Sequence, residues 1–331
     1  QEGYQVTPAR EIPKTALLPC CESGSTLRFL LPVAGALGVD ALFQLEGRLP
    51  QRPLSPLWEE MERMGCTLTR PDANTIRCQG RLIPGEYRID GGVSSQFITG
   101  LLLALPLVGG DSRLTVTGRV ESKPYIDLTK QVMALFGADA DIPGQCTYRS
   151  PGEIAVEGDW SNAAFFLAAN ALGSQIRLSG LSPDSVQGDR AAELWIPRLC
   201  QERCILDASD IPDLVPILSV VAAANHGAIF RNIQRLRIKE SDRAASTIAM
   251  LQNLGGYAEA TQDTLTVLGT SLAGGTVDAV NDHRIAMSAA IAATVCTQPV
   301  TILGAECVQK SYPLFWEEFR RLGGSYEQYL R

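Results

Sequence analysis

An excess of positive charge and long apolar runs are both missing from this 331-residue chain. Its 29 Lys and Arg residues are outnumbered by 36 Asp and Glu residues, which gives a formal net charge of -7. Nucleic-acid-binding surfaces need a basic face that neutralises phosphates, so this class of protein is disfavoured. The longest apolar runs, residues 97–109 and 285–295, are shorter than the roughly 20 residues that cross a bilayer. We therefore expect neither nucleic acid nor membrane as a partner, and any anion must be held by local clusters of cations.

Histidine is scarce, since His226 and His283 are the only two in the chain. Nine scattered cysteines, without a secretory signal at the start, fit reduced thiols better than a disulfide framework. Cys200 and Cys204 have a spacing that could suggest zinc, but no second pair of ligands stands at a suitable distance. We therefore expect a cytoplasmic protein without a bound metal.

One pattern recurs along the chain: a short polar motif, an apolar helix and a β-branched strand. Five copies begin at residues 23–26, 94–96, 161–164, 211–213 and 282–284. The copies are about 50 to 70 residues apart, and such self-similarity along the chain indicates a repeat. Six units would divide evenly between two domains, so a first unit is expected to be absent, unless the protein is an irregular set of five.

Two domains are predicted from the length and from a break in the pattern. Pro and Gly residues interrupt the periodicity at 151–158. We predict a first domain at residues 1–157, with two units and part of a third, and a second domain of three units at residues 158–331.

Two kinds of helix are predicted. Segments such as 97–105 and 165–172 are apolar on nearly every side, which predicts burial at the centre of a domain. A second kind has one apolar stripe and ends at a glycine, as at Gly65. The strands expected to cover the buried helices lie at residues 113–117, 175–178, 228–233 and 300–303. The predicted fold class is therefore α/β, with helices inside and sheets outside.

The densest group of charges lies at residues 237–243, directly before an amphipathic helix. Basic residues at a helix N-terminus oppose the helix dipole, so they cost stability unless an anion is present. A solvated charged face is the alternative. With an anion present, Lys239 is a candidate point charge or acid, Arg243 a clamp for phosphate or carboxylate, and Glu240 a proton donor or acceptor.

Polar residues open several other helices. Ser94, Ser95 and Gln96 stand at the start of a buried helix, where hydroxyl and backbone N–H groups can form a phosphate-binding site. A simple N-cap is the alternative interpretation of these residues. Asp213 is a candidate base or a simple cap, and residues 282–284 place an acid, an imidazole and a guanidinium at another buried helix. Three further candidates each stand near a proline at a helix start: Ser122, Arg52 and Lys310.

Together these groups predict an anion-binding cleft where the helix starts of two domains face each other. Catalysis there would rest on charge stabilisation and proton transfer, without a metal or an organic cofactor.

Six motifs, in this order, are similar to those of one enzyme family. They are ESGSTLR at residues 22–28, GVSSQ at 92–96, SKPYID at 122–127, LRIKESDR at 236–243, NDHRIAM at 281–287 and KSYP at 310–313. Over essentially the whole chain, the sequence resembles the 3-phosphoshikimate 1-carboxyvinyltransferase (EPSP synthase) family. The resemblance implies a two-domain inside-out α/β barrel, in which repeated α/β units have buried helices and outer sheets.

The resemblance also implies a reaction. The enolpyruvyl group of phosphoenolpyruvate is transferred to the 5-hydroxyl of 3-phosphoshikimate, through a tetrahedral intermediate that loses phosphate. This is a step of the shikimate pathway, which leads to chorismate and the aromatic amino acids. The two substrates are the implied partners, and we expect a monomer.

Roles are carried over from the family residue by residue. The implied catalytic residues are Asp213 as the base, Glu240 with Lys239 for proton transfer at the reacting carbons, and His283 beside them. The implied contacts of 3-phosphoshikimate are Ser94, Ser95, Gln96, Ser122, Tyr125, Asp213 and Lys239. The implied contacts of phosphoenolpyruvate are Gly24, Arg52, Gln96, Arg243, Arg284 and Lys310.

The sequence departs from the family pattern at three places. The family's first strand and its Gly-Ser-Lys-Ser-type loop have no counterpart, so about 70 residues, one repeat unit, are expected to precede the chain. The activity of the chain alone therefore stays open. Cys21 stands where relatives often have Gly, and Arg235 stands where some have Asn.

Two alternatives are an inactive fragment or remnant of this enzyme and a UDP-N-acetylglucosamine enolpyruvyl transferase. The SSQ and SKPY motifs, and the absence of the second family's catalytic cysteine loop, speak against the latter.

Overall fold

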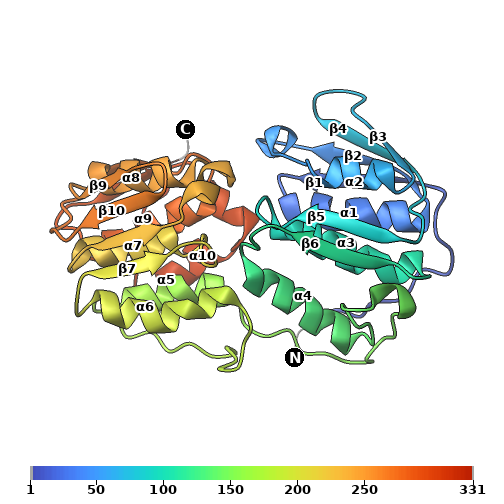
Figure 1. Cartoon of the computed structure of the whole chain (residues 1–331). Coiled ribbons are helices and arrows are strands. Elements are labelled where there is room, and N and C mark those ends of the chain that lie inside the picture. The colour runs from blue at the N-terminus through green and yellow to red at the C-terminus, as the bar shows by residue number, and fades with distance from the viewer. Residues whose placement is uncertain (1–2, 330–331) are drawn as a thin grey trace. The chain divides into compact units, whose positions relative to one another are not determined.

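The chain folds as two compact units, which divide between Ile154 and Ala155. The computed structural model describes residues 3–329, and Figure 1 shows helices and small sheets in both units. The boundary predicted from the sequence, between residues 157 and 158, lies slightly further along the chain.

The first unit opens with a four-stranded sheet. Its strand order is β1-β2-β4-β3, in which β1 and β2 are parallel and the other neighbours are antiparallel. Because α1 joins two parallel strands, it returns along the sheet and starts beside the end of β1. The elements are β1 (Thr15–Cys21), α1 (Gly24–Leu37), β2 (Asp40–Leu45), η1 (Leu49–Gln51), α2 (Leu57–Arg63), β3 (Cys66–Thr69) and β4 (Thr75–Gly80).

The rest of the first unit repeats the strand-helix-strand-helix order. Its two strands, β5 and β6, are parallel. The strand predicted at 113–117 and the buried helix predicted at 97–105 are both confirmed. The elements are β5 (Glu86–Asp90), α3 (Ser95–Val108), β6 (Arg113–Thr117), α4 (Lys123–Leu135) and η2 (Pro143–Gln145).

The second unit contains a sheet with the same plan as the first. Its strand order is β7-β8-β10-β9, again with one parallel pair followed by antiparallel neighbours. The elements are β7 (Cys204–Asp207), α7 (Val215–Ala224), β8 (Ala228–Arg231), η4 (Gln234–Ile238), α8 (Arg243–Asn253), β9 (Tyr257–Ala260) and β10 (Thr264–Leu268). The strand predicted at 228–233 is thus confirmed in its first part.

A second parallel pair closes the second unit, and it confirms the strand predicted at 300–303. The elements are β11 (Gly275–Asp278), α9 (His283–Ala293), β12 (Val300–Leu303), η5 (Ala305–Lys310) and α10 (Phe315–Arg321). Four of the five predicted repeat copies therefore have both a buried helix and a following strand.

The third copy differs from the prediction. Helix α5 (Trp160–Ala171) forms as expected, followed by η3 (Gly188–Ala191) and α6 (Ala192–Leu199), but residues 175–178 are not a strand. Exposure still alternates along this segment, with Ile176 and Leu178 half-buried and Arg177 exposed. Its side chains have a strand pattern, but within the described part of the chain its backbone pairs with no neighbouring strand.

The all-apolar helices form the core of each unit. In the first unit α1 packs against α3, so closely that a Cβ atom at Gly100 would lie 2.1 Å from the backbone oxygen of Arg28. In the second unit α5, α7 and α9 pack pairwise. The sheets and the amphipathic helices lie outside these helices, as the sequence predicted (Figure 1).

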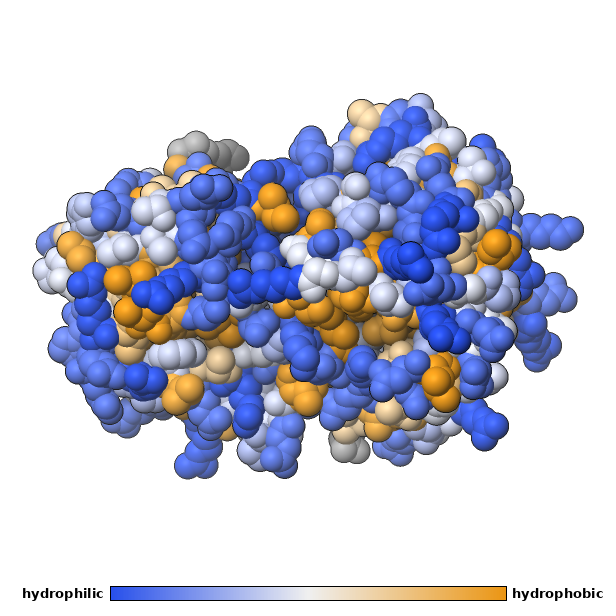
Figure 2. Space-filling view, viewed as in Figure 1, coloured by the Kyte–Doolittle hydropathy of each residue, from blue (hydrophilic) through white to orange (hydrophobic). Residues whose placement is uncertain are grey.

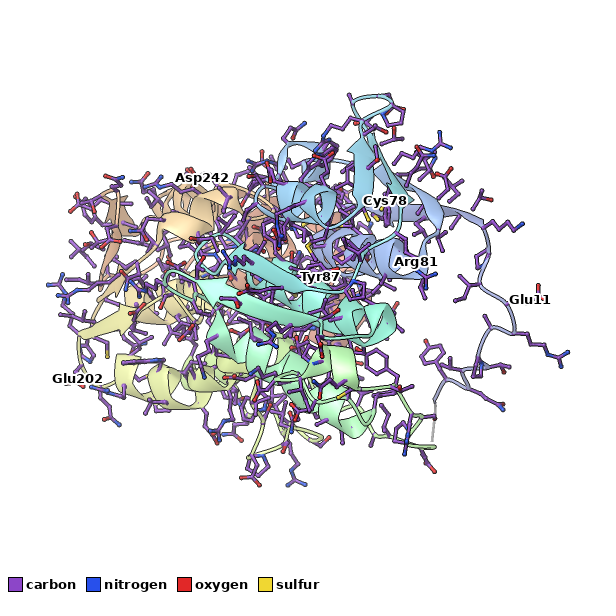
Figure 3. The ribbon with its side chains drawn as sticks, turned by 45° about the vertical axis from the view of Figure 1, so that its right-hand side comes forward. Glu11, Cys78, Arg81, Tyr87, Glu202 and Asp242 are labelled. Atoms are coloured by element: carbon purple, nitrogen blue, oxygen red, sulfur yellow. The ribbon has the colours of Figure 1, made fainter. Side chains whose placement is uncertain are left out.

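Inward-facing residues of the strands complete the core. Figure 3 labels Tyr87 on β5 and Cys78 on β4, and both are fully buried in the first unit. The Tyr87 hydroxyl donates to the carbonyl oxygen of Ile83 at 2.8 Å, so its polar atom stays satisfied. Burial raises the pKa of Tyr87, which keeps it neutral.

The surface is mixed in character. Hydrophilic residues cover much of the face drawn in Figure 2, with apolar residues scattered between them. Among residues 3–329, no helix is both long and apolar enough to cross a membrane. All nine cysteines are free thiols.

Candidate active site

Arg243 lies in a buried cluster of charges in the second unit. Its guanidinium is 1% exposed and donates to three carboxylates. Its Nη1 lies 2.6 Å from Asp213 Oδ1, its Nη2 lies 2.6 Å from Glu240 Oε2, and its Nε lies 3.1 Å from Asp282 Oδ2. A buried charge is costly unless it is paired and hydrogen-bonded. From the sequence, a cation at a helix start was expected to cost stability unless an anion is present. In the structure the protein's own carboxylates supply this negative charge.

Three helix starts of the second unit meet at this cluster. Arg243 is the first residue of α8, whose N-cap Asp242, labelled in Figure 3, accepts from the backbone N of Ala245. Asp282 is the N-cap of α9 and is fully buried. Asp213 lies just before α7. Because the positive ends of helix dipoles favour negative groups, the fold itself gathers carboxylates here.

Asp213 faces two further cations. Arg284 Nη2 lies 3.2 Å from Asp213 Oδ2, its Nη1 donates to the Asp213 carbonyl oxygen at 3.3 Å, and Lys239 Nζ lies 3.5 Å from Asp213 Oδ1. Burial by itself raises the pKa of Asp213, but Arg284, Lys239 and Arg243 together hold that pKa well below its usual range. Asp213 is therefore a carboxylate at neutral pH, and a weak base while all three cations face it.

Lys239 and His283 have weakened affinities for a proton. Burial lowers the pKa of Lys239, and Asp213 opposes this shift. Burial, followed by the positive charge of Arg284, lowers the pKa of His283 to about 4. His283 is thus neutral at pH 7, and its Nδ1 is buried without a hydrogen-bond partner among the described residues. Lys239 thus releases its proton more readily than an exposed lysine, whereas His283, which stays neutral at pH 7, can act there as a hydrogen-bonding group.

In this cluster three cations face three carboxylates, so the positive and negative charges balance. An anionic ligand would therefore compete with the protein's own carboxylates for the cations. Among residues 3–329 there is no group of three or more His, Cys, Asp or Glu side chains that could hold a metal ion. The cluster consists of the cations Lys239, Arg243 and Arg284 and the carboxylates Asp213, Glu240 and Asp282.

Lys310 lies at the exposed edge of the same region. It ends η5, and its Nζ donates to the carbonyl oxygen of Asn281 at 3.0 Å. Asn281 immediately precedes the N-cap of α9, so the ammonium group of Lys310 is held beside that helix start. This predicted contact therefore belongs to the same part of the second unit as Arg284.

Two arginines lie over Gly24 at the start of α1 in the first unit. A Cβ atom at Gly24 would lie 2.5 Å from Arg28 Nη1 and 2.9 Å from Arg52 Nη1, so a side chain there would displace a guanidinium. Arg28 Nη1 also donates to Gln96 Oε1 at 2.8 Å. Three of the predicted phosphoenolpyruvate contacts, Gly24, Arg52 and Gln96, are thus gathered around Arg28.

The predicted serines lie at two neighbouring helix starts. Ser94 caps α3, and both Ser94 and Ser95 are buried. Ser122 is the N-cap residue of α4 and is 1% exposed. The preceding residue, Glu121, donates its backbone N–H to the carbonyl oxygen of Gly91 at 3.3 Å. The loop that leads to Ser122 therefore packs beside the loop that leads to Ser94.

Tyr125 occupies the first turn of α4. Its carbonyl oxygen accepts from the hydroxyl of Thr129 at 2.8 Å, and that hydroxyl is also 2.8 Å from the hydroxyl of Thr99 on α3. Because this buried link ties α4 to α3, Tyr125 stays close to the predicted serines.

From the sequence, Asp282 was noted as the acid of residues 282–284 but was given no specific role, and Arg28 was not singled out although it stands inside a motif. An arginine in an apolar helix is the signal that could have marked Arg28. Cys21 has a φ of 48°, in the left-handed region that favours glycine, which fits the glycine expected there in relatives.

Comparisons with known proteins agree with these motifs. The family model described as EPSP synthase (3-phosphoshikimate 1-carboxyvinyltransferase) matches residues 2–197 and 202–319. The 3-phosphoshikimate 1-carboxyvinyltransferase of Clostridium kluyveri is 41% identical over 337 residues, which cover 94% of this chain and 79% of that protein. The enzyme of the same name from Clostridium novyi is 38% identical over 338 residues, covering 94% of this chain and 78% of the relative.

Two solved structures are similar in fold. EPSP synthase from Acinetobacter baumannii has a TM-score of 0.72 at 22% identity, covering 96% of this chain and 81% of that one. The enolpyruvyl transferase NikO from Streptomyces tendae has a TM-score of 0.65 at 17% identity, covering 91% of this chain and 76% of that one. Both likenesses support the inside-out α/β fold.

Proposed function

Because this chain belongs to the EPSP synthase family, we propose that the charged cluster around Arg243 and the helix starts around Arg28 hold its substrates. The function is transfer of the enolpyruvyl group of phosphoenolpyruvate to the 5-hydroxyl of 3-phosphoshikimate, with release of phosphate, in the shikimate pathway. The observation that carries this function is the family match over residues 2–197 and 202–319, which contain both groups of residues.

We propose that 3-phosphoshikimate is bound by serines at helix starts. The hydroxyls of Ser94, Ser95 and Ser122 stand where N–H groups and the positive helix dipole favour a phosphate. Tyr125 supplies an apolar surface for the ring, and Gln96 a polar contact. In the second unit, Asp213 and Lys239 would contact the hydroxyl groups.

We propose that phosphoenolpyruvate is bound by guanidinium and ammonium groups. Arg243 and Arg284 are buried, so their charges are little screened by water and their planar forks suit a carboxylate or phosphate. Lys310 adds a point charge beside the start of α9. The corresponding contacts in the first unit are Gly24, Arg52 and Gln96.

Asp213 is the proposed base. Its three cations keep it ionised but weakly basic. Anionic substrates that bind Arg243 and Arg284 would neutralise part of this positive charge, and the proton affinity of Asp213 would then rise. The base is thus strengthened when the substrates are in place.

The proposed steps follow from these groups. As the 5-hydroxyl oxygen bonds to C2 of phosphoenolpyruvate, its proton passes to Asp213, and C3 gains a proton from Glu240 or Lys239. Phosphate then leaves C2 while C3 returns a proton, which restores the C2–C3 double bond and forms the enol ether. His283, neutral at pH 7, would lie beside this proton transfer.

We further propose that the protein is a cytoplasmic monomer. Its nine cysteines are all free thiols, as is usual in a reducing compartment. The domain boundary near residue 157 is proposed on the Pro and Gly pattern described above.

Calorimetric titration with 3-phosphoshikimate tests this assignment, with UDP-N-acetylglucosamine as the control ligand. We expect the folded chain to bind 3-phosphoshikimate selectively. Ser95→Ala and Lys239→Met should each weaken that binding about tenfold, the effect of losing one charge-assisted hydrogen bond. Lys130→Met, which removes an exposed lysine paired with Asp141, is the matched control and should bind like the wild type.

Preference for UDP-N-acetylglucosamine would contradict the assignment of the substrate. Undiminished binding of 3-phosphoshikimate by both variants would instead contradict the proposed contacts.

A further inference from the structure

Two buried threonines join the helices that carry the proposed contacts of 3-phosphoshikimate in the first unit. Helices α3 and α4 pack against each other (Figure 1). The hydroxyl of Thr99 on α3 lies 2.8 Å from the hydroxyl of Thr129 on α4, and both side chains are buried. Neither threonine has a role in the function proposed above.

The hydrogen bonds of this pair run in one direction. The Thr129 hydroxyl donates to the carbonyl oxygen of Tyr125 at 2.8 Å, because a carbonyl oxygen can only accept. A hydroxyl group has a single proton, so Thr129 must accept from Thr99 in the bond between them. Thr99 therefore donates across the two helices to a group that is itself bonded to the first turn of α4.

The threonine pair lies one helical turn behind both helix starts. Thr99 follows Ser95 by four residues, and Thr129 follows Tyr125 by four residues, which corresponds to a rise of about 6 Å along an α-helix. On the other side of the helix starts, the two preceding loops are joined by the backbone hydrogen bond described above. The starts of α3 and α4 are thus tied together both in front and behind.

The backbone of Ser122 depends on this support. Its φ of 54° lies in the left-handed region, which is unfavourable for a residue other than glycine. Such conformations persist only where the surrounding structure holds them, and they are frequent at ligand sites. Because Ser122 is the N-cap residue of α4, its position depends on how α4 is held against α3.

We propose that Thr99 and Thr129 are positioning residues for 3-phosphoshikimate. Their hydrogen bond sets the separation of the two helix starts, so that Ser95 of α3 and Ser122 before α4 reach the same phosphate group. This inference rests on the proposed function, in which these serines bind 3-phosphoshikimate. The threonines act through the serines, from one turn further along each helix.

Valine and serine variants separate the hydroxyl group from the shape of the side chain. Valine has the shape of threonine without the hydroxyl, and serine keeps the hydroxyl without the methyl group. We expect Thr99→Val to weaken the binding of 3-phosphoshikimate about fivefold, the effect of losing one hydrogen bond, as measured by calorimetry on the folded chain. Thr99→Ser should bind like the wild type.

A double variant tests whether the two threonines act as one link. Thr129→Val should weaken binding at least as much as Thr99→Val, and the double variant should match Thr129→Val, because the same bond is lost only once. Thr294→Val is the matched control, since the hydroxyl of Thr294 donates to the carbonyl oxygen of Ile291 at the end of α9 in the second unit. This control should bind like the wild type.

The outcomes separate positioning from simple support of the fold. If the threonines only stabilise the fold, the valine variants lose stability, but the folded protein keeps its affinity for 3-phosphoshikimate. Unchanged affinity in Thr99→Val and Thr129→Val would therefore overturn the inference. A loss of affinity in Thr99→Ser equal to that in Thr99→Val would overturn it as well, because packing of the methyl group would then explain both.

Ser122→Ala distinguishes this failure from a failure of the proposed function. If Ser122→Ala binds 3-phosphoshikimate as tightly as the wild type, the proposed serine contact is wrong. If it loses affinity while Thr99→Val does not, only the role of the threonines is wrong. Thr99→Ala, which adds no bulk, replaces Thr99→Val with the same expected loss if the valine variant does not fold.

Discussion

The side chain of Arg243 is almost completely buried. Its guanidinium forms ion pairs with the carboxylates of Asp213, Glu240 and Asp282, which lie at the starts of three helices. Replacing a whole buried ion cluster by apolar residues is often tolerated, but removing one member leaves the others uncompensated. Without Arg243, Asp282 would lose the guanidinium that keeps its pKa below the usual range in spite of burial. The stability of the second unit therefore depends on this single side chain.

We predict that Arg243→Met lowers the free energy of unfolding of the second unit by about 3–5 kcal/mol, because it leaves buried carboxylates unpaired. Urea denaturation followed by circular dichroism measures the change. Arg203→Met, at an exposed position of the same unit, should cost less than about 0.5 kcal/mol. A loss below about 1 kcal/mol for Arg243→Met would mean that the carboxylates find other partners.

At the residue scale, the sequence could identify the cations but not what neutralises them. Lys239, Glu240 and Arg243 stand within five residues of each other, so their proximity follows from the sequence. Asp213 and Asp282 stand 30 and 39 residues from Arg243. Side chains so far apart give no local signal, and only the convergence of helix starts brings them together.

At the scale of elements, the crossing of α1 and α3 fixes the helix starts of the first unit. Gly100 allows the two backbones to approach, since a Cβ atom there would lie 2.1 Å from the Arg28 carbonyl oxygen and 3.2 Å from the Pro32 side chain. The same crossing places Arg28 beside Gln96. Packing at Gly100 and the geometry around Gly24 are thus linked.

We predict that Gly100→Ala destabilises the first unit by about 2 kcal/mol, since overpacking outweighs the gain in helix propensity. Thermal denaturation measures the loss. Gly3→Ala, whose Cβ would meet no atom within 4 Å, is the control and should be neutral. Equal or greater stability of Gly100→Ala would show that α1 and α3 can separate without cost.

The elements also show where reading the sequence succeeds and where it fails. The strand at 113–117 was predicted from its β-branched residues, and it forms because β5 lies parallel to it. Residues 175–178 have a similar alternation but no neighbouring strand within the described part of the chain. Alternation reports which side chains face inward, whereas a strand also needs a partner for its backbone, and that partner is set by topology.

At the scale of the whole molecule, each unit uses one plan repeatedly: a strand, a buried helix, a strand and an amphipathic helix. The two four-stranded sheets share one strand order, although they come from different halves of the chain. The repeat and the inside-out fold were predictable, because the polarity of each helix reveals its depth. The roles of individual site residues remain predictions, since they rest on the family and on local geometry.

The transfer reaction itself tests the central claim most directly. The measurement is release of phosphate from phosphoenolpyruvate, with and without 3-phosphoshikimate, by a chain shown to bind both. We predict release that depends on 3-phosphoshikimate and forms the enolpyruvyl product, and that Asp213→Asn lowers the rate about 100-fold or more, because a general base is lost. No release from a folded chain with both substrates bound, or an unchanged rate in Asp213→Asn, would contradict the account.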